Sequence, residues 1–273
     1  MVNALQLLVP LYIYPLECAN SRDLCAWKPL YDVIESYPTL QFVVVVNPNS
    51  GPGPIGSLPD ENYAAAITAV NSYPNVKSIG YIRSTWAARP VGEYQADVDT
   101  YAGFAASNYT IEGVFIDEAS NDVANLQYYQ DFSNYIHDKL PADDTLVVSN
   151  QGTVTPQEFF DTMPRDVFVT YEYYTSGQWD EGTIFNTNDP RFTSAPRDRQ
   201  ASIFHSWDSS APDDSTRLVN LTDYVGEVQK MKYIWVSTTD NYNSFPTNMA
   251  QFVSAVNGTN WYMEQHPEWF SRQ

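Results

Sequence analysis

The chain has 273 residues, of which 43% are hydrophobic and 17% are charged, a composition typical of a folded globular protein. Acidic residues outnumber basic residues by 33 to 14, and the net charge of −19 repels phosphate backbones, which makes nucleic acid a poor partner. The longest apolar run, Phe42–Val46, has the length of a strand and falls far short of the roughly 20 residues of a membrane span. We therefore expect a soluble protein without a membrane span.

Strand-like apolar runs alternate with helix-like segments along the whole chain. The expected strands cover residues 7–14, 42–46, 76–82, 113–117, 145–150, 166–172, 201–205 and 233–237. The expected helical segments cover residues 26–36, 64–70, 91–104, 126–140, 156–163, 216–231 and 248–256, while residues 173–197 are expected to be irregular. Near-continuous apolar strands separated by helices indicate a parallel sheet that is buried on both faces.

Eight such units predict a single (β/α)8 TIM barrel formed by residues 1–273, without a second domain. A doubly wound open sheet is the alternative fold. No Gly-rich nucleotide-binding loop follows the first strand, which weakens that alternative. We expect a monomer.

Two cysteines and three glycosylation sequons favour a secreted protein. Cys18 and Cys25 are seven residues apart, and a local disulfide is a better explanation for them than two free thiols. The sequons begin at Asn108, Asn220 and Asn257, and residues 1–3 do not resemble a signal peptide, so we expect any such peptide to have been removed. With three histidines in the whole sequence and these two cysteines, the residues indicate no metal cluster, and we expect no cofactor.

Carboxylates end two of the predicted strands. Asp117 and Glu118 follow the buried run Gly113–Ile116, and Glu172 ends the sixth strand among tyrosines. In a TIM barrel the active site lies at the C-terminal ends of the strands, and a carboxylate pair there suits hydrolysis of a glycosidic bond. Because successive strand residues face opposite sides, we expect Asp117 to point inward and Glu118 to lie at the lip. An acidic residue after a strand can also cap a helix or bond a tyrosine, so structural roles stay open for all three.

Amide and aromatic side chains follow the other strands and suit the binding of sugars. The loop that contains Asn47 and Asn49 is rich in Pro and Gly, so a simple turn is its default interpretation. His205 is equally explained as a residue of the site or as a satisfied barrel histidine. A Ser-His-Asp triad is compatible with the composition, but no Gly-x-Ser-x-Gly elbow is present. The predicted substrate-binding residues are Tyr12, Asn47, Asn49, Arg83, Asn150, Tyr171, His205 and Trp235.

The stretches VPLYIYP, VVVVNPNSGPG, GYIRSTWAARP, GVFIDEAS and VTYEYY together resemble the spherulin 4 family, glycoside hydrolase family 135. The resemblance extends over most of the chain, and NPNSGPG is its most specific part. It implies a (β/α)8 barrel that cuts α-1,4-linked N-acetylgalactosamine regions of galactosaminogalactan, with Asp117, Glu118 and Glu172 as the acidic cluster. Under this hypothesis the negative charge would attract partly deacetylated polymer, whose amino groups are cationic.

Besides a structural barrel with an unrelated ligand, two alternatives remain at this point. In the first, the acetamido group of the substrate is the nucleophile, Asp117 orients it, and a neighbouring glutamate is the acid. In the second, the protein is a non-catalytic wall or spore protein that binds polysaccharide with the same residues.

Overall fold

The computed structural model describes residues 4–140, 144–174 and 195–270 and contains a closed barrel of eight parallel strands. Each strand pairs with the next along the chain, and β8 closes the barrel by pairing with β1. The strands are β1 Gln6–Leu11, β2 Phe42–Val46, β3 Val76–Arg83, β4 Gly113–Asp117, β5 Leu146–Asn150, β6 Val167–Tyr174, β7 Gln200–His205 and β8 Tyr233–Val236. The predicted TIM barrel is confirmed.

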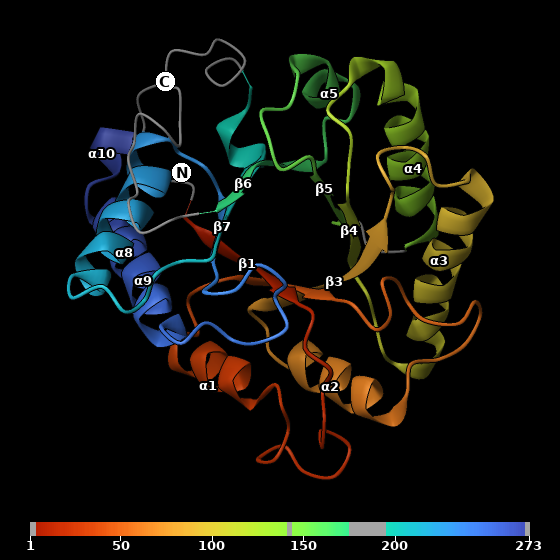
Figure 1. Cartoon of the computed structure of the whole chain (residues 1–273), viewed down its shortest axis with the longest axis horizontal. Coiled ribbons are helices and arrows are strands. Elements are labelled where there is room, and N and C mark those ends of the chain that lie inside the picture. The colour runs from red at the N-terminus through yellow and green to blue at the C-terminus, as the bar shows by residue number, and fades with distance from the viewer. Residues whose placement is uncertain (1–3, 141–143, 175–194, 271–273) are drawn as a thin grey trace.

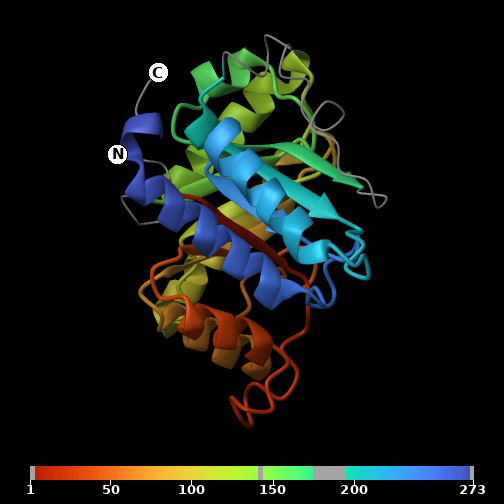
Figure 2. The ribbon, with the colours of Figure 1, turned by 90° about the vertical axis from the view of Figure 1, so that its left-hand side faces the viewer.

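Helices form a ring around the barrel (Figure 1), and in the perpendicular view α8 and α9 run beside the strands (Figure 2). The longer helices are α1 Lys28–Ser36, α2 Glu61–Asn71, α3 Val91–Phe104, α4 Leu126–Lys139, α5 Gln157–Thr162, α8 Asp214–Asp223 and α9 Met249–Gln265. The shorter ones are η1 Ala105–Ser107, η2 Val123–Asn125, η3 Arg197–Arg199, η4 Tyr224–Val228 and α10 Pro267–Phe270. In the part of the chain that is described, no helix is both long and apolar enough to cross a membrane.

Most predicted element boundaries agree with the structure to within two or three residues, and the larger differences have local causes. The last helix, expected over 248–256, continues to Gln265, and the first strand ends at Leu11, three residues before its expected end. The helix expected over 216–231 is α-helical only to Asp223 and continues as one π-helical turn, η4. The sixth strand extends to Tyr174, so two residues of the expected irregular segment are strand, and residues 175–194 of that segment lie outside the described residues.

Close packing explains two glycines within the strands. A Cβ atom on Gly80 would lie 2.5 Å from the ring of Tyr101 on α3, and one on Gly113 would lie 1.9 Å from the carbonyl oxygen of Leu146. A glycine in a strand interior weakens the strand, so it persists where a neighbour approaches this closely. These contacts place Gly80 on the helix side and the following residue, Tyr81, on the inside of the barrel.

A bulge in β6 decides which way the end of this strand faces. The register against β7 shifts between Val169 and Tyr171, so Thr170 is an extra residue. Phe168 points outward and packs on α5, where its ring centroid lies 4.6 Å from the ring centroid of Phe160. Without the bulge Glu172, four residues later, would face outward as well. The extra residue reverses the alternation and turns Glu172 into the barrel.

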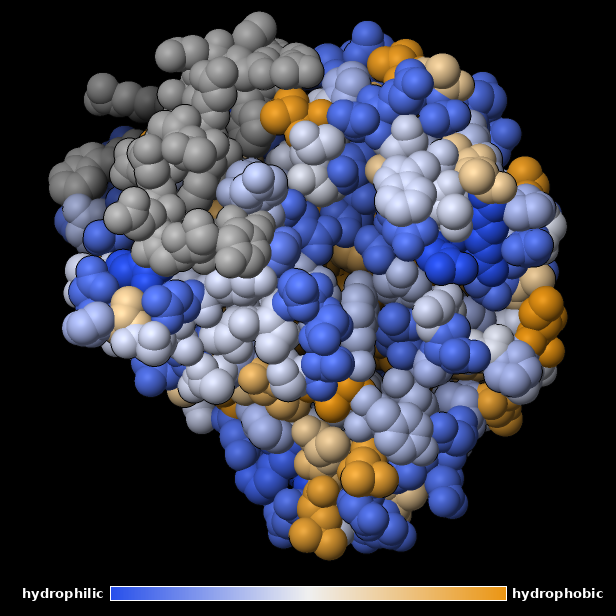
Figure 3. Space-filling model, viewed as in Figure 1, coloured by the Kyte–Doolittle hydropathy of each residue, from blue (hydrophilic) through white to orange (hydrophobic). Residues whose placement is uncertain are grey.

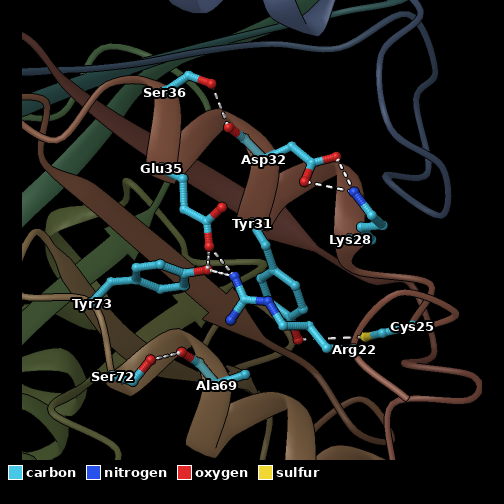
Figure 4. Close-up of polar contacts among 10 residues, drawn as sticks. All are labelled: Arg22, Cys25, Lys28, Tyr31, Asp32, Glu35, Ser36, Ala69, Ser72 and Tyr73. Carbon is cyan, nitrogen blue, oxygen red and sulfur yellow. Dashed lines mark hydrogen bonds and ion pairs between the residues drawn. The ribbon is translucent and has the colours of Figure 1, made fainter.

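The segment between β1 and α1 projects from the ring of helices and is held by a disulfide and an arginine. Cys18 and Cys25 are bonded, which confirms the expected disulfide. The Arg22 guanidinium lies 5.0 Å from the ring centroid of Tyr31 and contacts Glu35 and the hydroxyl of Tyr73 (Figure 4). This segment is therefore fixed to α1 and to the end of α2.

Candidate active site

One amide joins two of the predicted acidic residues at the C-terminal end of the barrel. The Nδ2 atom of Asn150, at the end of β5, donates to Asp117 Oδ1 over 2.8 Å and to Glu172 Oε2 over 2.6 Å. The two carboxylate oxygens are therefore no further apart than the sum of those distances, about 5.4 Å. Two ionised carboxylates at that range repel by about 3 kcal/mol at an effective dielectric constant of about 20. The arrangement favours one ionised and one protonated carboxylate.

Asp117 is the last residue of β4 and pairs in register with Arg83 of β3. The hydroxyl of Tyr81, also on β3, donates to Asp117 Oδ2 over 2.8 Å. Both carboxylate oxygens of Asp117 thus accept a hydrogen bond, which fixes the orientation of this carboxylate. The strand alternation that predicted an inward Asp117 agrees with these contacts.

Glu172 is the second carboxylate of the pair. Burial raises the pKa of Glu172, and the neighbouring Asp117 charge raises it further. Hydrogen bonds from Tyr242 and Asn150 act in the opposite direction, and so does the nearby His205. The hydroxyl of Tyr242 donates to Glu172 Oε1 over 2.5 Å. A glutamate with a raised pKa beside a second carboxylate has the properties of a general acid.

Three tyrosines surround the carboxylate pair. Tyr12 follows β1, and its ring lies edge-on to Tyr81 at 5.3 Å and to Tyr242 at 5.6 Å. The backbone N–H of Tyr12 also donates to the carbonyl of Tyr242. Burial raises the pKa of Tyr12, with further contributions from Asp117, Tyr81 and Glu172, so the phenol stays neutral next to the acids. The structure brings Tyr12 to the site, as expected.

Glu118 lies at the rim of the site. The backbone of Glu118 is left-handed, with a φ of 51°, so its side chain does not follow the in-and-out alternation of β4. This agrees with the expected position of Glu118 at the lip. Glu118 Oε2 is 3.9 Å from Nε of Arg83, whose side chain is half exposed. Burial raises the pKa of Glu118, while Arg83 lowers it and Asp117 raises it. The structure therefore places Arg83 at the rim, beside Glu118.

The two asparagines after β2 support a turn. Asn47 Oδ1 accepts a hydrogen bond from the backbone N–H of Gly51, and the carbonyl of Asn47 accepts one from Tyr63. Asn49 is exposed, and its N–H donates to the carbonyl of Gly51. The described contacts of Asn47 and Asn49 are those of a simple turn, which was the default interpretation. None of these contacts is with Asp117, Glu118 or Glu172.

The described ring contacts of two predicted binding residues, Tyr171 and Trp235, are packing contacts with other aromatic rings. The ring of Tyr171 packs on Phe204 at 5.1 Å, because the β6 bulge turns Glu172 inward and its neighbour to the other side. Trp235 is 3% exposed and packs edge-on against Phe252 of α9 at 5.7 Å.

Tyr81 and Tyr242 were missed by the sequence analysis. Tyr81 precedes Arg83 by two residues, so its inward direction follows from the strand period, and this signal was available. Tyr242 lies in the loop after β8, with a left-handed φ of 53°. Its contact with Glu172 spans 70 residues, and no local pattern predicts such a contact.

The space-filling view shows a hollow at the centre of the barrel end that faces the viewer, bordered mainly by hydrophilic residues (Figure 3). Within the described ranges, no group of three or more His, Cys, Asp and Glu side chains could hold a metal ion. The chemistry of the site, as described, rests on carboxylates, amides and phenols.

Comparisons with known proteins agree with the barrel fold. The model of spherulation-specific family 4 matches residues 6–256. Spherulin-4 of Physarum polycephalum is 32% identical over 156 residues, which are 57% of this chain but 41% of that longer protein. The crystal structure of Aspergillus clavatus Sph3 in complex with GalNAc matches with a TM-score of 0.77 at 30% identity, over 93% of this chain and 98% of that one. A GH5-4 broad specificity endoglucanase from Clostridum cellulovorans shares the fold, with a TM-score of 0.57 at 10% identity over 95% of this chain and 94% of that one.

Proposed function

Because this chain belongs to spherulation-specific family 4, we propose that it is an endo-acting glycoside hydrolase that cleaves α-1,4-linked N-acetylgalactosamine regions of galactosaminogalactan. The similar Aspergillus clavatus protein binds GalNAc, which supports an acetylated hexosamine as the ligand here. The two cysteines and the three sequons support action outside the cell.

The observation that carries the proposal is the Asn150 bridge between Asp117 and Glu172. Retaining glycosidases hold their two carboxyl groups about 5–5.5 Å apart, whereas inverting enzymes need about 6.5–9.5 Å to admit a water molecule. The upper limit of about 5.4 Å supports a retaining mechanism.

The environments of the two carboxylates support different roles. Glu172, with its raised pKa, donates its proton to the leaving glycosidic oxygen. The ionised Asp117 attacks the anomeric carbon as that bond breaks and forms a covalent glycosyl-enzyme. Glu172, now ionised, takes a proton from a water molecule, which attacks the anomeric carbon and releases Asp117. We assign Glu118 to substrate contact at the rim, because its carboxylate faces Arg83.

The test is incubation with galactosaminogalactan and mass analysis of the released oligomers. Internal cleavage would release oligomers of acetylated hexosamine, whereas products that contain plain hexose would contradict the specificity. Asp117→Asn and Glu172→Gln should each abolish cleavage while largely sparing binding. Glu227→Gln is a matched control, since burial raises the pKa of Glu227 too but this residue lies in η4, between α8 and β8.

The same experiment separates the two alternatives. A protein that binds the polymer but releases no oligomer would be a binding protein and would refute the enzymatic proposal. Cleavage of linkages between unsubstituted galactosamine units would exclude the route in which the acetamido group of the substrate is the nucleophile, because those units lack this group.

A further inference from the structure

The loop between β3 and α3 has an unusual backbone. Thr85, Trp86 and Ala87 have φ values of 50°, 51° and 69°, so three consecutive residues other than glycine are left-handed. Side chains with a Cβ atom disfavour this region, and a β-branched residue such as Thr85 does so most strongly. Such strain persists only where the surrounding structure enforces it, and strained residues cluster at functional sites.

The surrounding structure that enforces the strain is the end of β4. The backbone N–H of Trp86 donates to the carbonyl of Glu118 over 2.7 Å. The N–H of Ser84 donates to the carbonyl of Asp117 over 2.9 Å, and the Ser84 hydroxyl reaches the carbonyl oxygens of Asp117 and Glu118 at 2.9 Å each. The loop is thus attached to the two residues that carry the acidic side chains of the site.

The loop holds an exposed indole in this position. The Trp86 side chain is 62% exposed, and among the described residues its ring packs on no other aromatic ring. A single exposed apolar residue is common on protein surfaces and needs no explanation by itself. Here, however, the backbone accepts an unfavourable conformation to present a large ring that contributes little to the core.

We propose that Trp86 forms a sugar-binding subsite at the rim, where its indole face stacks on a galactose-configured pyranose ring of the substrate next to the unit at Asp117. This inference rests on the proposed function and deepens it. A pyranose with an axial 4-hydroxyl has one face made of C–H bonds, which suits the flat apolar ring of tryptophan. Arg83 and Glu118, beside the loop, supply polar partners for hydroxyl and amino groups of the same sugar.

The test measures binding of N-acetylgalactosamine oligomers in an Asp117→Asn background, so that cleavage does not interfere. Trp86→Ala should raise the Kd of long oligomers about tenfold, the scale expected for the loss of one stacked ring. Trp261→Ala is the matched control, because Trp261 is 61% exposed but lies in the C-terminal half of α9. This control should leave the Kd unchanged.

A glycine variant separates binding from folding. Glycine adopts a φ near 51° without steric cost, so Trp86→Gly should not lower Tm, yet it should weaken binding as Trp86→Ala does. In the active protein the loss should raise KM for long oligomers more than it lowers kcat. Equal Kd values for the parent, Trp86→Gly and Trp261→Ala would overturn the subsite even if the parent cleaves the polymer. A parent that neither binds nor cleaves the polymer would overturn the proposed function, and the subsite with it.

Discussion

Removal of the Tyr242 hydroxyl by Tyr242→Phe tests the role of Glu172 as the acid. This substitution deletes one oxygen atom and leaves the ring that packs on Tyr12. The deleted hydroxyl donates to Glu172 Oε1, and this hydrogen bond is one of the interactions that lower the pKa of Glu172 against the effect of burial.

The magnitude follows from the energy of a hydrogen bond to a charged group, about 1.5–3 kcal/mol. Loss of this bond removes an interaction that lowers the pKa of Glu172, so the pKa of Glu172 should rise. A general acid works in its protonated form, and a higher pKa keeps it protonated to a higher pH. The alkaline limb of the pH profile should therefore move to higher pH.

The assay is kcat/KM for oligomer cleavage as a function of pH, which reports the titration of the free enzyme. Tyr81→Phe is the matched control, because the Tyr81 hydroxyl donates to Asp117 and not to Glu172. It should leave the alkaline limb where it is in the parent. An alkaline limb that stays in place or moves downward in Tyr242→Phe would refute the assignment of Glu172 as the acid.

Two further predictions concern the same pair of carboxylates and its support. The short distance between Asp117 and Glu172 predicts that the first-formed product keeps the anomeric configuration of the substrate, and an inverted product in early NMR spectra would contradict it. Gly152→Ala should lower the free energy of unfolding by about 1 kcal/mol, because φ is +63° there. Its new Cβ would lie 3.6 Å from Cβ of Glu172, an ordinary contact, so kcat/KM should stay unchanged, and a loss of activity with unaltered Tm would contradict this prediction.

The barrel was predictable from the sequence because its signals are local. Apolar runs such as Phe42–Val46 need only their own composition to be recognised as buried strands. The inward direction of Asp117 follows from the same strand period, since it ends a regular strand.

The rest of the site depends on interactions that no local pattern contains. Glu172 faces inward only because Thr170 is an extra residue in β6, and a regular alternation would have turned it outward. Trp235 is buried and its ring contacts Phe252 of α9, a contact that no local pattern at the end of β8 predicts. Tyr242 reaches Glu172 from a loop whose course the sequence does not specify.

Backbone strain is distributed unevenly between the two ends of the barrel. Among the described residues other than glycine, ten have a positive φ, and only Asn108 and Lys230 of these lie in loops that lead into strands. The loops that follow strands contain Glu17, Ser50, Thr85, Trp86, Ala87, Glu118, Ser206 and Tyr242. A left-handed residue with a side chain costs about 1–2 kcal/mol, so the barrel core must offset several kcal/mol at the end that carries the carboxylates. Strain concentrated there is expected if these loops are selected for the positions of their side chains, because selection for stability alone would favour glycine at each of them.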